Sequence, residues 1–173
     1  MLRLLYDPVA EIKSFKKEGI AKALLYLLAS SLMLCAGLLL FSFKFKLIPD
    51  NLLIYAIVGG LFGIIALYLV FAFFFSVAMH VLDGNGGFYE GLAATVLALA
   101  APSVAALLAG AIAFIPFGIY LSVLLMMYGI VLSTAVFLRA GKELYNADYF
   151  AVFAAALVVK LCLYGSIVLF ILL

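Results

Sequence analysis

No charged residue occurs between Glu90 and Arg139, and similar uncharged runs fill most of the chain. Hydrophobic residues make up 71% of the 173 positions and charged residues 10%. Soluble domains are about half apolar and about a quarter charged, so this composition excludes that class. Because the runs are about twenty residues or longer and do not alternate in polarity, they predict membrane-spanning helices and not barrel strands.

The sequence therefore predicts an all-α, polytopic transmembrane helical bundle. Its five spans lie at roughly Ile20–Phe43, Leu52–Leu82, Tyr89–Ala113, Pro116–Ala140 and Tyr149–Leu173. The second is longer than the roughly 20 residues that cross a bilayer, so it should tilt or protrude. Pro116 disfavours helix at the preceding residue and suits a new helix start, which predicts a tight hairpin between spans three and four. A re-entrant loop is the alternative. The first span lacks a cleavage site, so we expect it to be retained.

The distribution of Lys and Arg predicts the orientation. With the N-terminus in the cytoplasm and five crossings, the C-terminus is extracytoplasmic. The cytoplasmic segments then hold seven basic residues, and the outer segments hold only Lys44 and Lys46. The seven are Arg3, Lys13, Lys16, Lys17, Lys22, Arg139 and Lys142.

Residues 1–19 are interpreted as a separate N-terminal unit, before a transmembrane domain at 20–173. Asp7, Pro8 and Gly19 are typical of helix ends. Val9, Ile12 and Phe15 lie toward one side of the predicted helix, with Lys13, Lys16 and Lys17 around the other. This pattern predicts an interfacial amphipathic helix whose lysines contact anionic headgroups. A charged helical lead-in to the first span is the alternative.

The sequence offers little for catalysis or metal binding. His80 is the sole histidine, and only Asp83 and Glu90 lie near it. The stretch "DGNGGFYE" starts like a calcium loop but lacks the remaining spacing, and it is better interpreted as a turn that caps two helices. Cys35 and Cys162 are interpreted as small buried hydrophobic residues. We predict no enzyme activity, no metal, no cofactor and, with a net charge of only +2, no nucleic-acid partner.

Small residues recur at four-residue spacing in several spans, which favours close helix packing in lipid. This packing is either within one chain or in a homo-oligomer. Pro102 should kink the third span, with Thr95 and Ser103 satisfying freed backbone groups. The residues predicted to pack are Gly59, Gly63, Ala101, Ala105, Ala109, Gly129 and Ser133.

Lys160 lies near the middle of the fifth span. A lysine at the centre of a bilayer costs about 2.5–3.5 kcal/mol, and no acid lies within any span to pair with it. It is therefore expected to face the bundle interior or a wet cavity, near Tyr164, Tyr120, Tyr128 or carbonyls around Pro102. The site would bind an anion or a lipid headgroup, or it would serve a structural hydrogen-bonding role.

Three stretches of the chain carry a family resemblance. The first is "DPVAEIKSFKKEGIAKALLYLL", and the last is "TAVFLRAGKELYNADYFAVFAAAL". The middle one runs from "MHVLDGNGG" through "AAPSV" and "FIPFG" to "MMYGIVLS". In this order they resemble the Yip domain (Ypt/Rab-interacting protein) family. The chain departs from the family in lacking its "DLYGP"-type signature, in whose place it has "YDPVA". The resemblance implies five transmembrane helices and a cytoplasmic N-terminus.

Eukaryotic members of that family act in traffic between ER and Golgi, bind Rab-type GTPases and associate with one another. This chain is similar to short archaeal or bacterial members, which implies a prokaryotic cell membrane. The resemblance predicts a non-enzymatic membrane protein that organises the bilayer or a protein partner at the cytoplasmic face. The alternative is a small oligomeric channel or transporter with Lys160 in its pathway.

Overall fold

In the computed structural model, the described part of the chain is helical apart from short turns. It comprises residues 11–12, 14–15, 19–82 and 84–172, without the side chains of residues 50 and 164–172. The elements are α3 (Ile20–Phe45), the short 3-10 helix η1 (Asp50–Leu52), α4 (Leu53–Val81), α5 (Phe88–Ile112), α6 (Gly118–Tyr145) and α7 (Tyr149–Leu172).

The helix boundaries agree with the expected spans to within a few residues, except at the end of α6, which continues to Tyr145. Spans three and four are two separate helices joined by a tight turn, as the hairpin interpretation predicted. Helix α6 begins at Gly118 and not at Pro116. Phe117 immediately before it adopts a left-handed backbone conformation with φ of 61°, which stops the helix from extending backwards.

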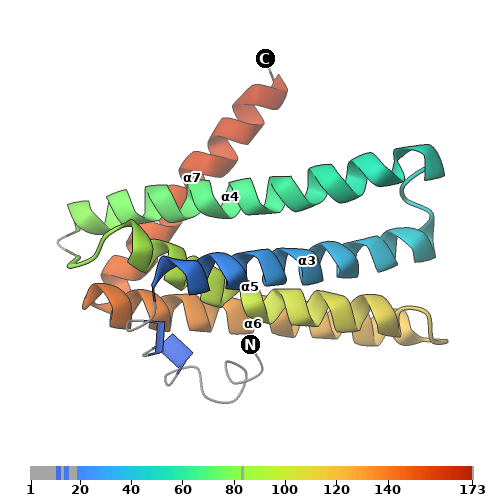
Figure 1. The fold of residues 1–173 in the computed structure, drawn as a ribbon, viewed down its shortest axis with the longest axis horizontal. Helices are drawn as coiled ribbons and strands as arrows, with labels where there is room; N and C mark the ends of the chain where they lie inside the picture. The colour runs from blue at the N-terminus through green and yellow to red at the C-terminus, as the bar shows by residue number, and fades with distance from the viewer. Residues whose placement is uncertain (1–10, 13, 16–18, 83, 173) are drawn as a thin grey trace.

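Helices α3 to α6 run side by side in alternating directions, and α5 is the central one (Figure 1). In its most hydrophobic 18-residue window, 78% of α5 is buried, against 17–28% for α3, α4 and α6. Helix α7 crosses the others at a steep inclination and packs against α4 and α6. The bundle therefore has an apolar core built around one almost fully enclosed helix.

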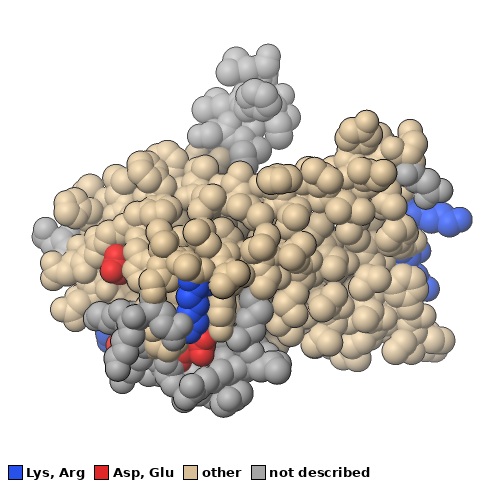
Figure 2. Space-filling view, in the orientation of Figure 1, with Lys and Arg blue, Asp and Glu red and all other residues tan. Residues whose placement is uncertain are grey.

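Four helices, α3 to α6, are long and apolar enough to cross a membrane, and the described side chains of α7 continue as a shorter apolar helix to Leu163. Large apolar side chains project outward from these helices, for example Phe62 at 67% exposure and Leu124 at 62%. Figure 2 shows few charged side chains on this flank, with basic residues at one end of the bundle and both signs of charge in the half toward the other end. Such a surface would aggregate in water but suits hydrocarbon.

Helices α3 and α5 cross with their backbones in direct contact. A Cβ added at Gly37 would overlap the Ala106 backbone, and one at Gly110 would lie 2.7 Å from the Gly37 carbonyl oxygen. Only glycine permits this approach, and close backbone packing stabilises helix association where lipid removes the hydrophobic effect. The sequence analysis did not single out this pair.

Helix α5 continues through Pro102 and changes direction partway along (Figure 1). Proline removes one backbone hydrogen bond from a helix. Nearby hydroxyls bond to backbone carbonyls, because Ser103 Oγ donates to Leu99 at 2.7 Å and Thr95 Oγ1 contacts the Gly91 and Leu92 carbonyls at 2.9 Å. Both hydroxyls are thereby satisfied inside the core, but neither bonds the Ala98 carbonyl, which loses its amide partner to Pro102, so their expected role was wrong.

The two cysteines are free, and they differ in environment. Cys35 is buried as expected, but Cys162 is exposed on α7. The expectation of burial was wrong for Cys162 because the steep α7 presents that side of its surface outward.

Candidate functional site

One end of the bundle is held together around Tyr145, the last residue of α6. The Tyr145 side chain is fully buried, and its hydroxyl donates to the Gly87 carbonyl oxygen at 2.9 Å. The same hydroxyl lies 2.9 Å from Ser76 Oγ of α4. The phenol ring packs edge-on against Phe75, with 5.7 Å between ring centroids. We call Tyr145, Ser76 and the loop Gly84–Gly87 the Tyr145 lock.

The Tyr145 ring and Ser76 exclude a side chain at two nearby glycines, Gly86 of the loop and Gly91 of α5. A Cβ at Gly86 would lie 2.6 Å from the ring, and one at Gly91, in the first turns of α5, would overlap Ser76 Oγ. The backbone amide of Asn85 donates to the Tyr145 carbonyl at 3.0 Å. The loop is therefore fixed to the end of α6 by ring contact and by backbone bonding.

Glu90 caps the start of α5. Its carboxylate accepts a hydrogen bond from the Gly87 amide at 2.8 Å, which satisfies one of the free amides at a helix N-terminus. This agrees with the interpretation of "DGNGG" as a capping turn. Among the described residues, no group of three His, Cys, Asp or Glu side chains is placed to hold a metal.

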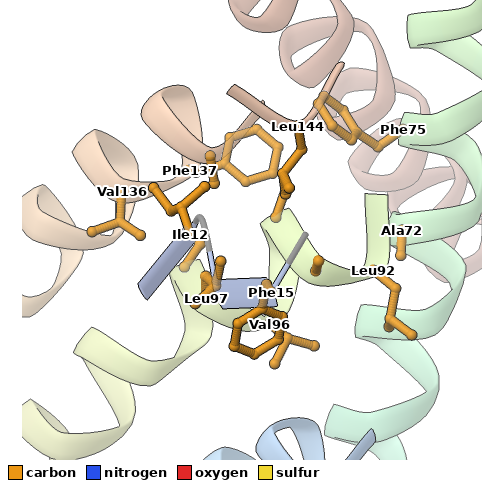
Figure 3. Close-up of a cluster of buried hydrophobic side chains, with 14 of the residues drawn as sticks. Ile12, Phe15, Ala72, Phe75, Leu92, Val96, Leu97, Val136, Phe137 and Leu144 are labelled. Atoms are coloured by element: carbon orange, nitrogen blue, oxygen red, sulfur yellow. The ribbon is translucent and has the colours of Figure 1, made fainter. Parts of the chain in front are cut away.

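The described part of the N-terminal segment packs into the same end of the bundle. Ile12 and Phe15 are buried, at 1% and 0% exposure, in one cluster with side chains of α4, α5 and α6 (Figure 3). Tyr89 at the start of α5 donates a short hydrogen bond to the Phe15 carbonyl. The N-terminal segment thus covers this end of the core together with helices that lie far from it in the sequence.

A polar cluster fastens this segment to α3. Glu11 is buried at 6% exposure and accepts a hydrogen bond from the Tyr26 hydroxyl at 2.7 Å. Lys22 Nζ lies 3.8 Å from the Glu11 carboxylate, 3.1 Å from Ser14 Oγ and 4.8 Å from the centre of the Phe15 ring. The Glu11 carboxylate is largely withdrawn from water, so removing Lys22 would leave a buried charge without its ionic partner.

These contacts correct one part of the amphipathic-helix prediction. Ile12 and Phe15 were expected to face the bilayer, but both side chains are buried against protein. The physical reason is that burial against apolar protein side chains removes Ile12 and Phe15 from water as effectively as lipid does. Lys13, Lys16 and Lys17 lie outside the described residues, so their contact with headgroups stays a prediction.

Lys160 lines a groove of about 290 Å³ formed by α4, α5, α6 and α7. Thr95 and Ala98 of α5, both buried, belong to its lining, and Phe71, Phe137 and Phe153 contribute aromatic walls. Hydroxyl groups of Tyr68, Ser133 and Thr134 are also present among the lining residues. We call this the Lys160 groove. Lys160 itself is exposed, so it lies at a surface groove and not in the closed interior.

Three of the residues predicted to share a site with Lys160, namely Tyr120, Tyr128 and Pro102, do not line this groove. Tyr120 and Tyr128 are exposed on α6, at 71% and 63%, and Pro102 packs beneath Gly129. The side chain of Tyr164 lies outside the described residues. The predicted polar site is therefore not assembled by the described residues. The periodicity of the sequence could not show this because it does not fix which sides of α6 and α7 face each other.

The predicted small-residue rows have two different environments. Ala101, Ala105 and Ala109 are buried, a Cβ at Gly129 would lie 2.5 Å from Ala105 Cβ, and Ser133 lines the Lys160 groove. Gly59 and Gly63 face open space, with no atom within 4 Å of an added Cβ. Packing within the described chain therefore uses the rows of α5 and α6, while the α4 pair is left free for lipid or for another copy.

Tyr145 and Ser76 were not predicted from the sequence. Their signal was weak, because a tyrosine before "NAD" and a serine in an apolar run are both ordinary in a membrane helix. Only the chain reversal that brings the ends of α4 and α6 together gives these residues their shared role.

Comparison with known proteins gives one clear match. A family model described as the Yip1 domain matches residues 2–171, nearly the whole chain. No curated protein and no solved structure matches. The match covers the Tyr145 lock, the N-terminal segment and the Lys160 groove, and so the chain, an apolar helical membrane protein, belongs to the Yip1 domain family.

Proposed function

We propose that this protein is a non-enzymatic integral membrane protein that organises the membrane or a partner protein at the end of the bundle that carries the Tyr145 lock. Membership of the Yip1 family supports this proposal. So does the apolar flank, which leaves the ends of the bundle as the polar surfaces (Figure 2).

The observation that carries the proposal is the difference between the two ends. At the Tyr145 end, hydrogen bonds and an ion pair join the N-terminal segment to α3 and α5, and a hydrogen bond joins the Gly84–Gly87 loop to the end of α6. Charged side chains gather there, including a second ion pair between Arg139 and Glu143 at 3.4 Å. The opposite end has short connections with Lys44 near Phe114. A fixed, charged surface favours specific recognition because little ordering entropy is lost on binding.

We place the Tyr145 end in the cytoplasm and propose that α7 completes a fifth crossing. The support is the excess of Lys and Arg assigned to that side. Two exposed asparagines, Asn85 and Asn51, lie in connections at opposite ends of the bundle and allow a matched test. With Cys162→Ser as background, we expect an impermeant thiol reagent to label Asn51→Cys in intact cells and Asn85→Cys only after permeabilisation.

The same labelling tests the role of the N-terminal lysines. Changing Lys13, Lys16 and Lys17 to Gln removes three of the seven inner basic residues, so we expect part of the population to invert. Labelling of Asn85→Cys in intact cells would then rise. An unchanged pattern would show that these lysines do not set the orientation.

Photocrosslinking from the same two positions tests the organising role. A thiol-linked crosslinker on Asn85→Cys should give discrete adducts in native membranes, and one on Asn51→Cys should give none. Adding Tyr145→Phe should weaken the adducts, because the loop loses its hydrogen bond to the ring hydroxyl. Equal adducts from both ends, or none from Asn85→Cys, would contradict a partner surface at this end.

The second candidate function is a small oligomeric channel or transporter. It is favoured by one observation, the location of Lys160 in a groove. The groove wall is mostly apolar, however, and Tyr120, Tyr128 and Pro102 are not part of its lining. An organising role thus has the broader support.

A further inference from the structure

The Lys160 groove combines an apolar trough with one positive charge. Its described lining residues include Leu67 and Phe71 of α4 and Phe153 and Leu157 of α7, and none of the lining residues is acidic. Phe153 and Leu157 are exposed at 52% and 47%, so this side of the groove is open to the surrounding solvent, which for this chain is lipid. The groove is therefore accessible sideways from the bilayer.

The ammonium group of Lys160 has no counter-charge in this lining. A charged lysine in hydrocarbon is costly, and such residues normally pair or reach toward an interface. The hydroxyl group of Ser133 would supply a hydrogen bond but no negative charge. The chemistry of the groove thus favours an occupant that carries an anion.

The inclination of α7 decides how deep that anion would lie. Because α7 crosses the other helices steeply, each of its residues advances less along the bundle axis than in an upright helix (Figure 1). Lys160 therefore lies closer to the Tyr145 end than its position in the sequence suggests. The flexible lysine stem shortens the remaining distance to that interface.

We propose that the Lys160 groove binds an anionic phospholipid, with part of an acyl chain along Phe71, Phe153 and Leu157 and the phosphate at Lys160. A volume of about 290 Å³ is at the lower end of ligand sites, near 300 Å³, which suits one slender chain and not a bulky solute. A free inorganic anion would leave the aromatic walls without a role. This site is independent of the partner surface proposed above.

The absence of tryptophan from the chain permits a direct test. Phe153→Trp places a single fluorophore in the groove, and Leu161→Trp places one on the same helix, 63% exposed and outside the groove lining. Each full-length variant is reconstituted in phosphatidylcholine vesicles, and quenching is measured with brominated phosphatidylglycerol or brominated phosphatidylcholine of the same chain length. Leu157→Trp, also in the lining, is the second reporter should Phe153→Trp fail to fold.

We expect the groove tryptophan to favour phosphatidylglycerol by about fivefold, the effect of one lysine on anionic lipid, and Leu161→Trp to show no preference. Lys160→Gln should remove the preference, while Lys44→Gln, at the far end of the bundle, should keep it. The proposal is overturned by equal quenching in the groove, by the same preference at Leu161→Trp, or by a preference that survives Lys160→Gln. It is also overturned if millimolar inorganic phosphate abolishes the preference, since the site would then bind the anion alone.

Discussion

The hydroxyl oxygens of Tyr145 and Ser76 lie 2.9 Å apart, although 69 positions separate the two residues in the chain. The Tyr145 hydroxyl also bonds the Gly87 carbonyl, and Ser76 Oγ also lies 2.8 Å from the Ala72 carbonyl, so either hydroxyl can be the donor in the contact between them. One side-chain contact thus joins α4, α6 and the loop that leads into α5.

Removing either hydroxyl should weaken this end of the bundle. Hydrogen bonds between membrane helices contribute about 0.6 kcal/mol on average, with a maximum of about 1.7, and we expect Tyr145→Phe and Ser76→Ala to fall in that range. The double variant should lose less than the sum of the two single changes. Unfolding by SDS, followed by circular dichroism, measures all three. Tyr128→Phe, exposed on α6, is the matched control, and strict additivity would contradict the coupling.

The same substitution, glycine to alanine, should have opposite effects on stability at Gly37 and at Gly63. Gly37→Ala should destabilise the fold by about 1–3 kcal/mol, because the new methyl group overlaps the Ala106 backbone of α5. Gly63→Ala should be neutral or slightly stabilising, because its surroundings are open and alanine is the better helix former. The measurement is again SDS unfolding. A loss of oligomer in Gly63→Ala, seen by size in detergent, would assign the Gly59–Gly63 face to self-association; equal destabilisation by both variants would contradict the packing described here.

Phe15 should anchor the N-terminal segment. Phe15→Ala leaves a cavity in a fully buried site, and such changes cost about 3–5 kcal/mol in soluble proteins. We expect the segment to detach before the bundle unfolds, so protease cleavage before Gly19 should become faster while the helical signal is kept. Phe43→Ala, 53% exposed toward the opposite end of α3, serves as control. Unaltered cleavage would mean that the segment is held by other contacts.

Replacing Lys160 separates the organising role from transport. In liposomes loaded with ions or small dyes, we expect Lys160→Leu and the original chain to give the same flux, at the level of protein-free vesicles. The reason is that the groove walls are mainly apolar and that Tyr120, Tyr128 and Pro102 lie outside its lining. Flux through the original chain that disappears in Lys160→Leu would establish the transporter alternative.

The sequence alone indicated that lipid surrounds most of this protein, and it predicted where the helices lie. Uncharged runs of about twenty residues leave helix as the only way to satisfy the backbone in lipid, so the positions of α3 to α7 follow from composition and from Pro116. The order of loosely defined motifs also identified the family.

The tertiary structure decided which side of each helix meets another helix. In uniformly apolar helices the side that faces lipid is no more hydrophobic than the side that faces protein, so periodicity carries little information about rotation. For this reason Gly37 could not be distinguished from Gly63, nor Tyr145 from Tyr128. The burial of Phe15 and the steep inclination of α7, the helix that carries Lys160, likewise depend on contacts between distant segments. No local sequence pattern specifies such contacts.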